Sequence, residues 1–183
     1  MVDSRKTKKI VLMGLDAAGK SSILLSLQND TRLSSFQDLA PTIDVNRSTI
    51  TDEHNDFFIF DFGGQEASRK GYLRELDKHL EGVDKVIFVI DIQDSRRHPL
   101  ALDYLQKIVI HLATTRGAPP SGHFQLAIFL HKYDPLPGGK ENKDLELLAR
   151  DLASKIARIV PHSMSFEIQL TSMVVRLQKT RFK

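Results

Sequence analysis

A glycine-rich stretch at residues 14–22, GLDAAGKSS, constrains the fold more than any other part of the chain. It matches the pattern G-x-x-x-x-G-K-[ST], whose fixed positions are here Gly14, Gly19, Lys20 and Ser21. An apolar, strand-like run at 9–14 leads into it, and a helical pattern at 20–28 follows. Glycines let the backbone approach phosphates closely, and a helix N-terminus points its partial positive charge at the same place. The sequence therefore predicts a phosphate-binding loop between a buried strand and a helix.

The residue types in this loop suit the phosphates of a nucleotide and the metal ion that accompanies them. Lys20 can reach the β and γ phosphates, and the Ser21 hydroxyl is placed to ligate Mg²⁺. Asp16 brings a carboxylate close to the phosphates, and because this is repulsive we expect its side chain to point outward. The loop residues that we expect to bind the nucleotide are Asp16, Ala17, Ala18, Gly19, Lys20, Ser21 and Ser22.

Strand-like apolar runs and helical patterns alternate along the rest of the chain. We predict strands at 9–14, 45–51, 57–61, 85–91, 125–130 and 165–170, and helices at 20–28, 73–80, 98–115, 143–160 and 174–181. The runs 45–51 and 57–61 form a hairpin around DEHND, and we expect the Gly-rich, polar stretch 63–72 to be mobile. The alternation favours an α/β domain with a six-stranded, mostly parallel sheet, one antiparallel edge strand and helices on both faces. Ligands of such sheets bind at the carboxyl ends of the strands.

Composition limits the class of protein further. A chain of 183 residues predicts one domain, here divided into a basic N-terminal tail at 1–8 and a folded domain at 9–183. The net charge of +3 gives no indication of nucleic-acid binding. The absence of cysteine excludes disulfides, prenylation and palmitoylation, and Val2 excludes N-myristoylation. No apolar run approaches the roughly 20 residues that span a membrane. We therefore expect a cytoplasmic protein whose basic tail makes at most weak, reversible contact with a membrane surface.

Two further stretches supply groups for a metal ion and an attacking water. The third predicted strand ends in DFGGQE, where Asp61 offers a carboxylate to Mg²⁺ through water. The Gly64 N–H can reach a γ-phosphate, and the Gln65 amide can orient the attacking water. In the loop APTID, the hydroxyl and the backbone N–H of Thr42 can bind Mg²⁺ and the γ-phosphate. The predicted catalytic residues are Lys20, Thr42 and Gln65, and the predicted metal ligands are Ser21, Thr42 and Asp61.

Together, GLDAAGKSS, PTI and DFGGQE resemble the small GTPases, and most closely the Arf and Arf-like branch of the Ras-like superfamily. The resemblance implies a G domain of the P-loop NTPase fold that binds GTP or GDP with Mg²⁺, hydrolyses GTP slowly and changes the conformation of two switch segments. Thr42 then falls in switch I, and residues 61–80 form switch II. It also implies an effector, an exchange factor and an activating protein as partners. Arg69 and Arg74 lie near switch II, and either could act as a catalytic arginine within the chain. Exposed helix arginines are usually only solvated, so we expect both to be solvated and the catalytic arginine to come from a separate activating protein.

The resemblance assigns the segment 131–134, HKYD, to recognition of the base. The Asp134 carboxylate can accept hydrogen bonds from N1–H and the 2-amino group of guanine, which adenine does not offer. Lys132 can lay its alkyl stem along the ring face. Thr171 and Ser172 fit the family's last base motif, where a backbone N–H donates to guanine O6. His131 replaces the usual asparagine, and we expect it to support the site, for which its ring could donate to a carbonyl of the phosphate loop. The alternatives are a direct contact with guanine N7 and a histidine at the edge of the core with no ligand role.

His131 leaves a second function open. The sequence HKYD is similar to the base motif of the Rag GTPases, which pair as dimers and sit on roadblock-type scaffolds. The alternative is therefore a non-hydrolysing nucleotide-binding scaffold that acts as a homo- or heterodimer. Gln65 and Thr42 favour hydrolysis instead. A P-loop kinase or ATPase is a third alternative, but no arginine-rich lid is apparent and Asp134 argues for guanine.

Overall fold

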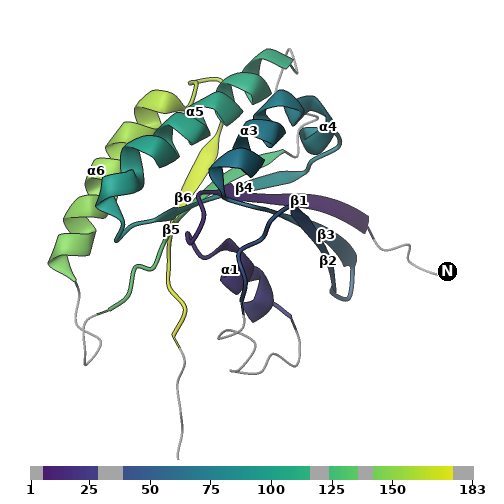
Figure 1. The fold of residues 1–183 in the computed structure, drawn as a ribbon, viewed down its shortest axis with the longest axis horizontal. Helices are drawn as coiled ribbons and strands as arrows, with labels where there is room; N and C mark the ends of the chain where they lie inside the picture. Colours follow the sequence, from purple (N-terminus) through teal and green to yellow (C-terminus); the bar gives the residue numbers. More distant parts are fainter. Residues whose placement is uncertain (1–5, 29–38, 116–123, 136–141, 175–183) are drawn as a thin grey trace, which may run out of the picture.

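The computed structural model describes residues 6–28, 39–115, 124–135 and 142–174, which build an α/β fold around a six-stranded sheet (Figure 1). The strands are β1 (Lys6–Gly14), β2 (Val45–Thr51), β3 (Asn55–Phe62), β4 (Lys85–Asp91), β5 (Gln125–His131) and β6 (Phe166–Thr171). Across the sheet their order is β2-β3-β1-β4-β5-β6. β2 runs antiparallel to β3, whereas the other neighbouring pairs are parallel. The predicted sheet, with one antiparallel strand at its edge, is confirmed.

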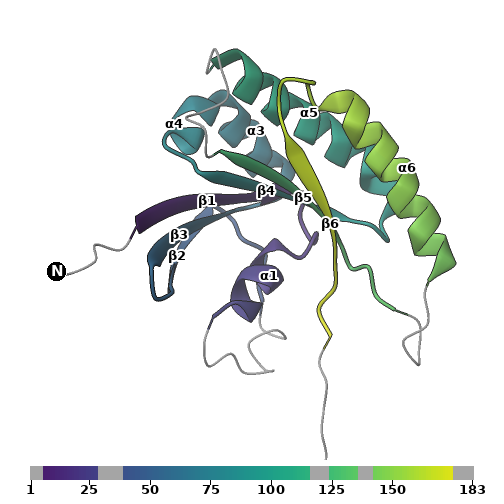
Figure 2. The same cartoon turned by 180° about the vertical axis from the view of Figure 1, so that it is seen from behind.

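Helices cover both faces of this sheet, as the sequence indicates. They are α1 (Lys20–Ser26), α3 (Glu66–Arg74), α4 (Leu76–Leu80), α5 (His98–Thr115) and α6 (Lys143–Ile159), with the short 3-10 helix η1 (Ser95–Arg97). Figures 1 and 2, which view the molecule from opposite sides, place α1 against one face and α3 to α6 against the other. Among the described residues, no helix combines the length and the apolar character needed to cross a membrane.

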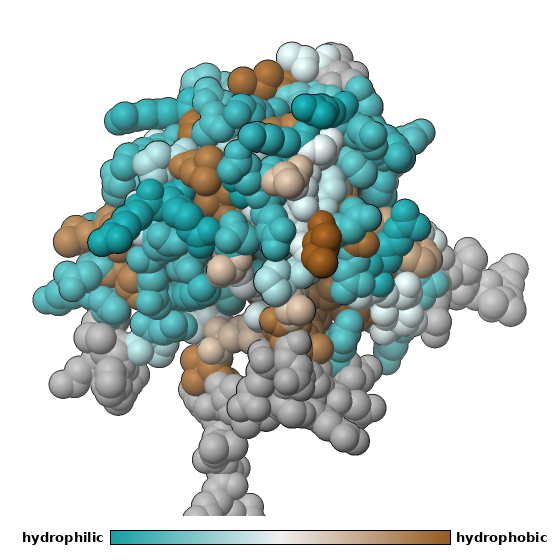
Figure 3. All heavy atoms as spheres, viewed as in Figure 1, coloured by the Kyte–Doolittle hydropathy of each residue, from teal (hydrophilic) through white to brown (hydrophobic). Residues whose placement is uncertain are grey.

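The main core lies between the sheet and the layer that contains α5 and α6. β4 buries Val86, Phe88 and Ile90 in this layer, and α5 adds Leu105 and Ile108. Burying each such side chain contributes about 1.5–3 kcal/mol relative to leaving it exposed. A smaller cluster, under α1, consists of Leu12, Leu24 and Ile59. On the face that Figure 3 shows, the coloured surface is mostly hydrophilic, with apolar residues in small scattered patches. The apolar residues that recur along the strands and helices therefore mostly face the interior.

Some elements begin or end elsewhere than the sequence indicates. β1 begins at Lys6, which pairs with Asn55 of β3, so part of the predicted basic tail belongs to the sheet. α1 ends at Ser26, earlier than predicted. The predicted helix 174–181 lies, apart from Val174, outside the described residues.

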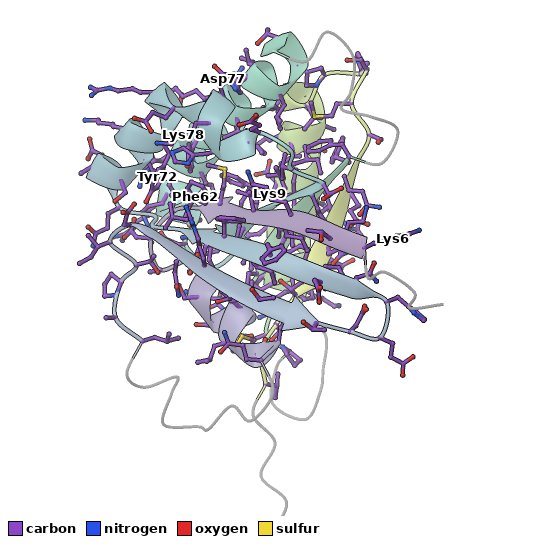
Figure 4. The ribbon with its side chains drawn as sticks, turned by 90° about the vertical axis from the view of Figure 1, so that its right-hand side faces the viewer. Lys6, Lys9, Phe62, Tyr72, Asp77 and Lys78 are labelled. Carbon is purple, nitrogen blue, oxygen red and sulfur yellow. The ribbon has the colours of Figure 1, made fainter. Side chains whose placement is uncertain are left out.

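The stretch 63–72, predicted to be mobile, is instead helical from Glu66 onward. Its sequence is polar, and only Arg69 and Tyr72 among the residues of α3 are buried. The Tyr72 ring packs edge-on against Phe62 of β3, with 4.7 Å between ring centroids, and Figure 4 shows the two labelled side chains together. α3 is thus fixed by tertiary contacts with the sheet, which a local pattern of hydropathy does not reveal.

Candidate functional site

A cavity of about 360 Å³ opens at the carboxyl ends of β1 and β3, where the sequence predicts a ligand site. Its walls bring together predicted residues from distant parts of the chain, namely Asp16, Ala17, Gly19, Lys20, Ser21, Ser22, Thr42, Gly64, Gln65 and Lys132. Leu39, Ala40 and Pro41, directly before Thr42, also line it and were not predicted. Their only signal in the sequence is their position next to Thr42.

The phosphate loop turns sharply at the start of α1, as its glycines indicate. Gly19 has a φ of 96°, in the left-handed region that favours glycine. A Cβ atom on Gly19 would lie 2.8 Å from Nε2 of His131 and closer still to Cδ2 of the same ring. Lys20 is buried, and its Nζ donates to the carbonyl oxygens of Gly14 at 3.3 Å and Leu15 at 2.8 Å. Burial lowers the pKa of the Lys20 ammonium, although nearby carboxylates oppose the shift.

The predicted metal ligands converge on one point beside this loop. Ser21 Oγ donates to Oδ2 of Asp61 at 2.5 Å, and the Ser21 and Thr42 hydroxyl oxygens are 3.1 Å apart. Asp61 is fully buried, and within the described residues its Oδ1 atom has no hydrogen-bond partner. Burial raises the pKa of the Asp61 carboxyl above its ordinary value.

Two hydroxyl groups thus lie beside a buried carboxylate, one oxygen of which has no hydrogen-bond partner within the described residues. Such oxygen ligands fit the chemistry of Mg²⁺, which binds proteins through a few oxygens and keeps other positions for water or phosphate. Within the described residues no cluster of three or more His, Cys, Asp or Glu side chains forms a metal site of its own. The arrangement of Ser21, Thr42 and Asp61 therefore suits a cation that a bound phosphate helps to hold.

Gly64 packs directly on the phosphate loop. The Asp16 backbone N–H donates to the Gly64 carbonyl at 3.0 Å, and a Cβ atom on Gly64 would overlap the Asp16 backbone nitrogen. Gln65, which follows, is exposed at the N-terminus of α3 and lines the cavity. The close approach explains why glycine is required at residue 64, and it leaves the Gln65 amide beside the phosphate loop.

Two arginines hold the Asp16 side chain, which is 45% exposed. Arg97 of η1 donates from Nη1 to Oδ2 of Asp16 at 3.1 Å, and Nη1 of Arg69 lies 3.7 Å from Oδ1. These ion pairs offset the repulsion between the Asp16 carboxylate and a phosphate. Arg97 was not predicted, because nothing in its sequence neighbourhood distinguishes it from a surface arginine.

The expectation that Arg69 is a solvated helix residue is wrong. Its side chain is buried, Nη1 donates to the Gly64 carbonyl, and the guanidinium lies 5.9 Å from the centre of the Tyr104 ring. Arg74, at the end of the same helix, is exposed as predicted. The difference arises because residue 69 faces the phosphate loop and residue 74 faces away from the core.

The predicted base-reading residues lie at the carboxyl ends of β5 and β6 and on the loops that follow them. Lys132 donates from Nζ to the Ala17 carbonyl at 2.8 Å and to Oδ2 of Asp91 at 2.6 Å. Asp134 accepts from the Ser172 hydroxyl through Oδ1 and from Nε2 of Gln93, at 3.1 Å, through Oδ2. The base loop is thereby attached to the phosphate loop and to the last predicted motif.

His131 lies between the phosphate loop and the last strand. It is 4% exposed, its Nδ1 is 3.0 Å from the Thr171 hydroxyl oxygen, and its ring packs against Gly19. Burial lowers the pKa of this imidazole, which favours its neutral form. No described hydrogen bond joins His131 to a phosphate-loop carbonyl; the ring instead fills the space that Gly19 leaves open.

A phosphate loop and an oxygen cluster occur together in many nucleotide-binding proteins. Here a lysine–aspartate loop is hydrogen-bonded to that same phosphate loop, and the sheet carries one antiparallel edge strand next to β3, the strand that contains Asp61. This combination of fold and site defines the class of small GTPases.

Comparisons with known proteins agree with this class. The sequence model of the ADP-ribosylation factor family matches residues 1–178, and the chain belongs to this family. Over 133 residues it is 34% identical to ADP-ribosylation factor-like protein 5 of Caenorhabditis elegans, a match that covers 73% of this chain and 66% of that protein's length.

Solved structures support the same fold. The structure of the Arl6 BBS3 small GTPase from Trypanosoma brucei, with the bound nucleotide analogue GppNp, is similar with a TM-score of 0.67 and 25% identity, over 91% of this chain and 87% of that one. The mammalian SRP receptor shares the fold with a TM-score of 0.64 and 16% identity, over 90% of this chain and 91% of that one.

Proposed function

We propose that this chain is a switch that binds GTP with Mg²⁺, hydrolyses it slowly to GDP, and controls partner binding through the segments around Thr42 and 61–80. The observation that carries the proposal is the hydrogen bond of 2.8 Å from Lys132 Nζ to the Ala17 carbonyl. It joins the base-reading loop to the phosphate loop, so that one nucleotide can contact both. The similar Arl6 structure holds a nucleotide analogue, which supports the same use of the site here.

In this proposal the phosphates bind to the N–H groups of the loop 16–22 and to Lys20, whose Nζ leaves the Gly14 and Leu15 carbonyls to reach them. Ser21, Thr42 and Asp61 would hold the metal ion, and a bound Mg²⁺ would supply positive charge that neutralises the phosphates. Gln65 orients the attacking water, and the Gly64 N–H donates to the γ-phosphate.

Guanine is the proposed base because Asp134 offers two carboxylate oxygens to its paired N–H donors. Lys132 covers the ring, and the backbone N–H groups near Thr171 and Ser172 face O6. The contacts of His131 with Gly19 and Thr171 support a role in holding the base loop against the phosphate loop, in place of the asparagine that the family commonly has.

We further propose that an effector, an exchange factor and an activating protein act on the switch segments. Because Arg69 is buried and bonded to Gly64, it is not free to enter the site, which favours an arginine supplied by the activating protein. The family match does not favour the alternative of a non-hydrolysing, dimeric scaffold with a Rag-like base motif.

Purified protein with Mg²⁺ and either GTP or ATP tests the proposal, with nucleotide binding and phosphate release followed together. We expect binding of GTP but not ATP and slow release of phosphate. Gln65→Leu should abolish the release and leave binding intact, because the amide acts on the water rather than on the nucleotide. Gln125→Leu, an exposed site at the opposite end of β5, is the matched control. Equal affinity for ATP, or release unchanged by Gln65→Leu, would contradict the proposed mechanism.

A further inference from the structure

Gln93, in the turn after β4, is bonded to the base loop although it is exposed and distant from it in sequence. Its side-chain Nε2 donates to the Lys132 carbonyl at 2.8 Å and to Oδ2 of Asp134 at 3.1 Å. Its backbone N–H donates to Oδ1 of Asp91 at 3.0 Å, and the other oxygen of Asp91 accepts from Lys132 Nζ. The Gln93 side chain therefore joins the turn after β4 directly to the loop after β5, and its backbone is linked to the same loop through Asp91.

The Lys132 backbone depends on such support. Its φ of 63° lies in the left-handed region, which a non-glycine residue adopts only when its surroundings compensate for the strain. The hydrogen bond from Gln93 to the Lys132 carbonyl lies at this strained residue, and Asp134 follows two positions later. The amide of Gln93 thus fixes the backbone that presents Asp134.

The Asp134 carboxylate is itself oriented by two donors. Ser172 donates to Oδ1 and Gln93 donates to Oδ2, so each oxygen has one partner. An ionised carboxylate has about four lone-pair sites, two on each oxygen. One site on each oxygen is left, and a paired donor edge such as N1–H and the 2-amino group of guanine requires one acceptor site on each oxygen.

We propose that Gln93 is a positioning residue that sets the specificity of the site for purine nucleotides with a 2-amino group, by holding the Asp134 carboxylate in the orientation that accepts both donors. The inference rests on the proposed guanine-nucleotide function of the same site. Gln93 acts through Asp134 and does not touch the base. Without the Gln93 amide the Asp134 carboxylate can turn. Binding of a base that donates to both carboxylate oxygens is then weakened more than binding of a base that donates to one.

The test compares guanosine diphosphate with inosine diphosphate, which lacks the 2-amino group. Affinities of the wild-type chain and of Gln93→Leu for both nucleotides are measured by displacement of a fluorescent GDP. We expect the wild-type chain to prefer GDP, and Gln93→Leu to reduce the ratio of the two affinities about tenfold, the lower end of the effect of one lost hydrogen bond to a charged group. Gln125→Leu, the same substitution on an exposed residue away from the site, should leave the ratio unchanged.

Different results identify what has failed. If Gln93→Leu weakens binding of both nucleotides equally, with the ratio kept, Gln93 has only a structural role and the inference is overturned. Tighter binding of GDP by Gln93→Leu would also overturn it, because the amide would then compete with the base for Asp134. Failure of the wild-type chain to bind GDP would refute the proposed function, and the inference with it, whereas the first two results leave the proposed function standing.

Discussion

Replacing Arg69 with methionine removes a buried guanidinium from the contact between α3 and the phosphate loop while keeping a long side chain. In the wild-type structure this side chain is 9% exposed, and its Nη1 donates to the Gly64 carbonyl. Its guanidinium also lies over the Tyr104 ring and 3.7 Å from the Asp16 carboxylate. The stability of this variant therefore measures how much a buried arginine contributes to holding α3 on the phosphate loop.

The magnitude follows from these contacts. A hydrogen bond from a charged donor contributes about 1.5–3 kcal/mol. The contact with Tyr104 adds about 0.5–1 kcal/mol. The ion pair with Asp16 adds little, because Asp16 is 45% exposed and solvent screens it. Removing a buried charge also removes its desolvation cost, so we take a net loss of about 2 kcal/mol. For a domain of this size that corresponds to a fall in Tm of roughly 4–8 °C.

Thermal and urea unfolding of the nucleotide-free protein measure this loss. Arg74→Met is the matched control, because it makes the same change on an exposed residue of the same helix, and we expect it to alter stability by less than about 0.5 kcal/mol. If Arg69→Met is as stable as the wild-type chain, or if Arg74→Met destabilises it equally, the guanidinium does not hold α3 in the way described.

Three further predictions concern the phosphate loop and two buried titratable groups near it, Asp61 and His131. Gly19→Ala should abolish GDP retention, and adding His131→Ala should restore only part of it, because the clash is relieved but the φ of 96° stays strained; full retention by Gly19→Ala alone would contradict the packing. Because burial raises the pKa of Asp61, the folded protein binds more protons than the unfolded chain, so this residue lowers stability as pH rises through the raised pKa. In EDTA without nucleotide, Asp61→Asn should therefore raise Tm at pH 7 yet weaken Mg²⁺-dependent GTP binding, and a lower Tm would refute the sign. Because burial lowers the pKa of His131, the unfolded chain binds more protons, so the wild-type Tm should fall more than that of His131→Asn as pH drops below the ordinary histidine value; parallel curves would show that His131 titrates normally.

The sequence predicted the parts of the molecule that depend on local chemistry. The phosphate loop, the hairpin of β2 and β3 and the buried run of β4 follow from short patterns whose physics lies within a few residues. Because ligands bind at the carboxyl ends of parallel strands, the sequence also predicted that Asp61 and Lys132 lie at the same edge of the sheet. The phosphate-loop residues could be named from such patterns alone, whereas the base-site residues were named from the resemblance to a family.

Only the tertiary structure decided which of these loops touch and what holds them. Arg69 and Arg74 look alike in the sequence, and only the docking of α3 on the sheet buries the first beside Gly64. Gln93 carries no motif, and it meets Asp134 because β4 and β5 are neighbours in the sheet. By itself the sequence predicted the α/β fold, which the structure confirms, together with the phosphate loop and the candidate site residues. The strand order determined the contacts among them, because those contacts join residues that are far apart along the chain and close only at one edge of the sheet.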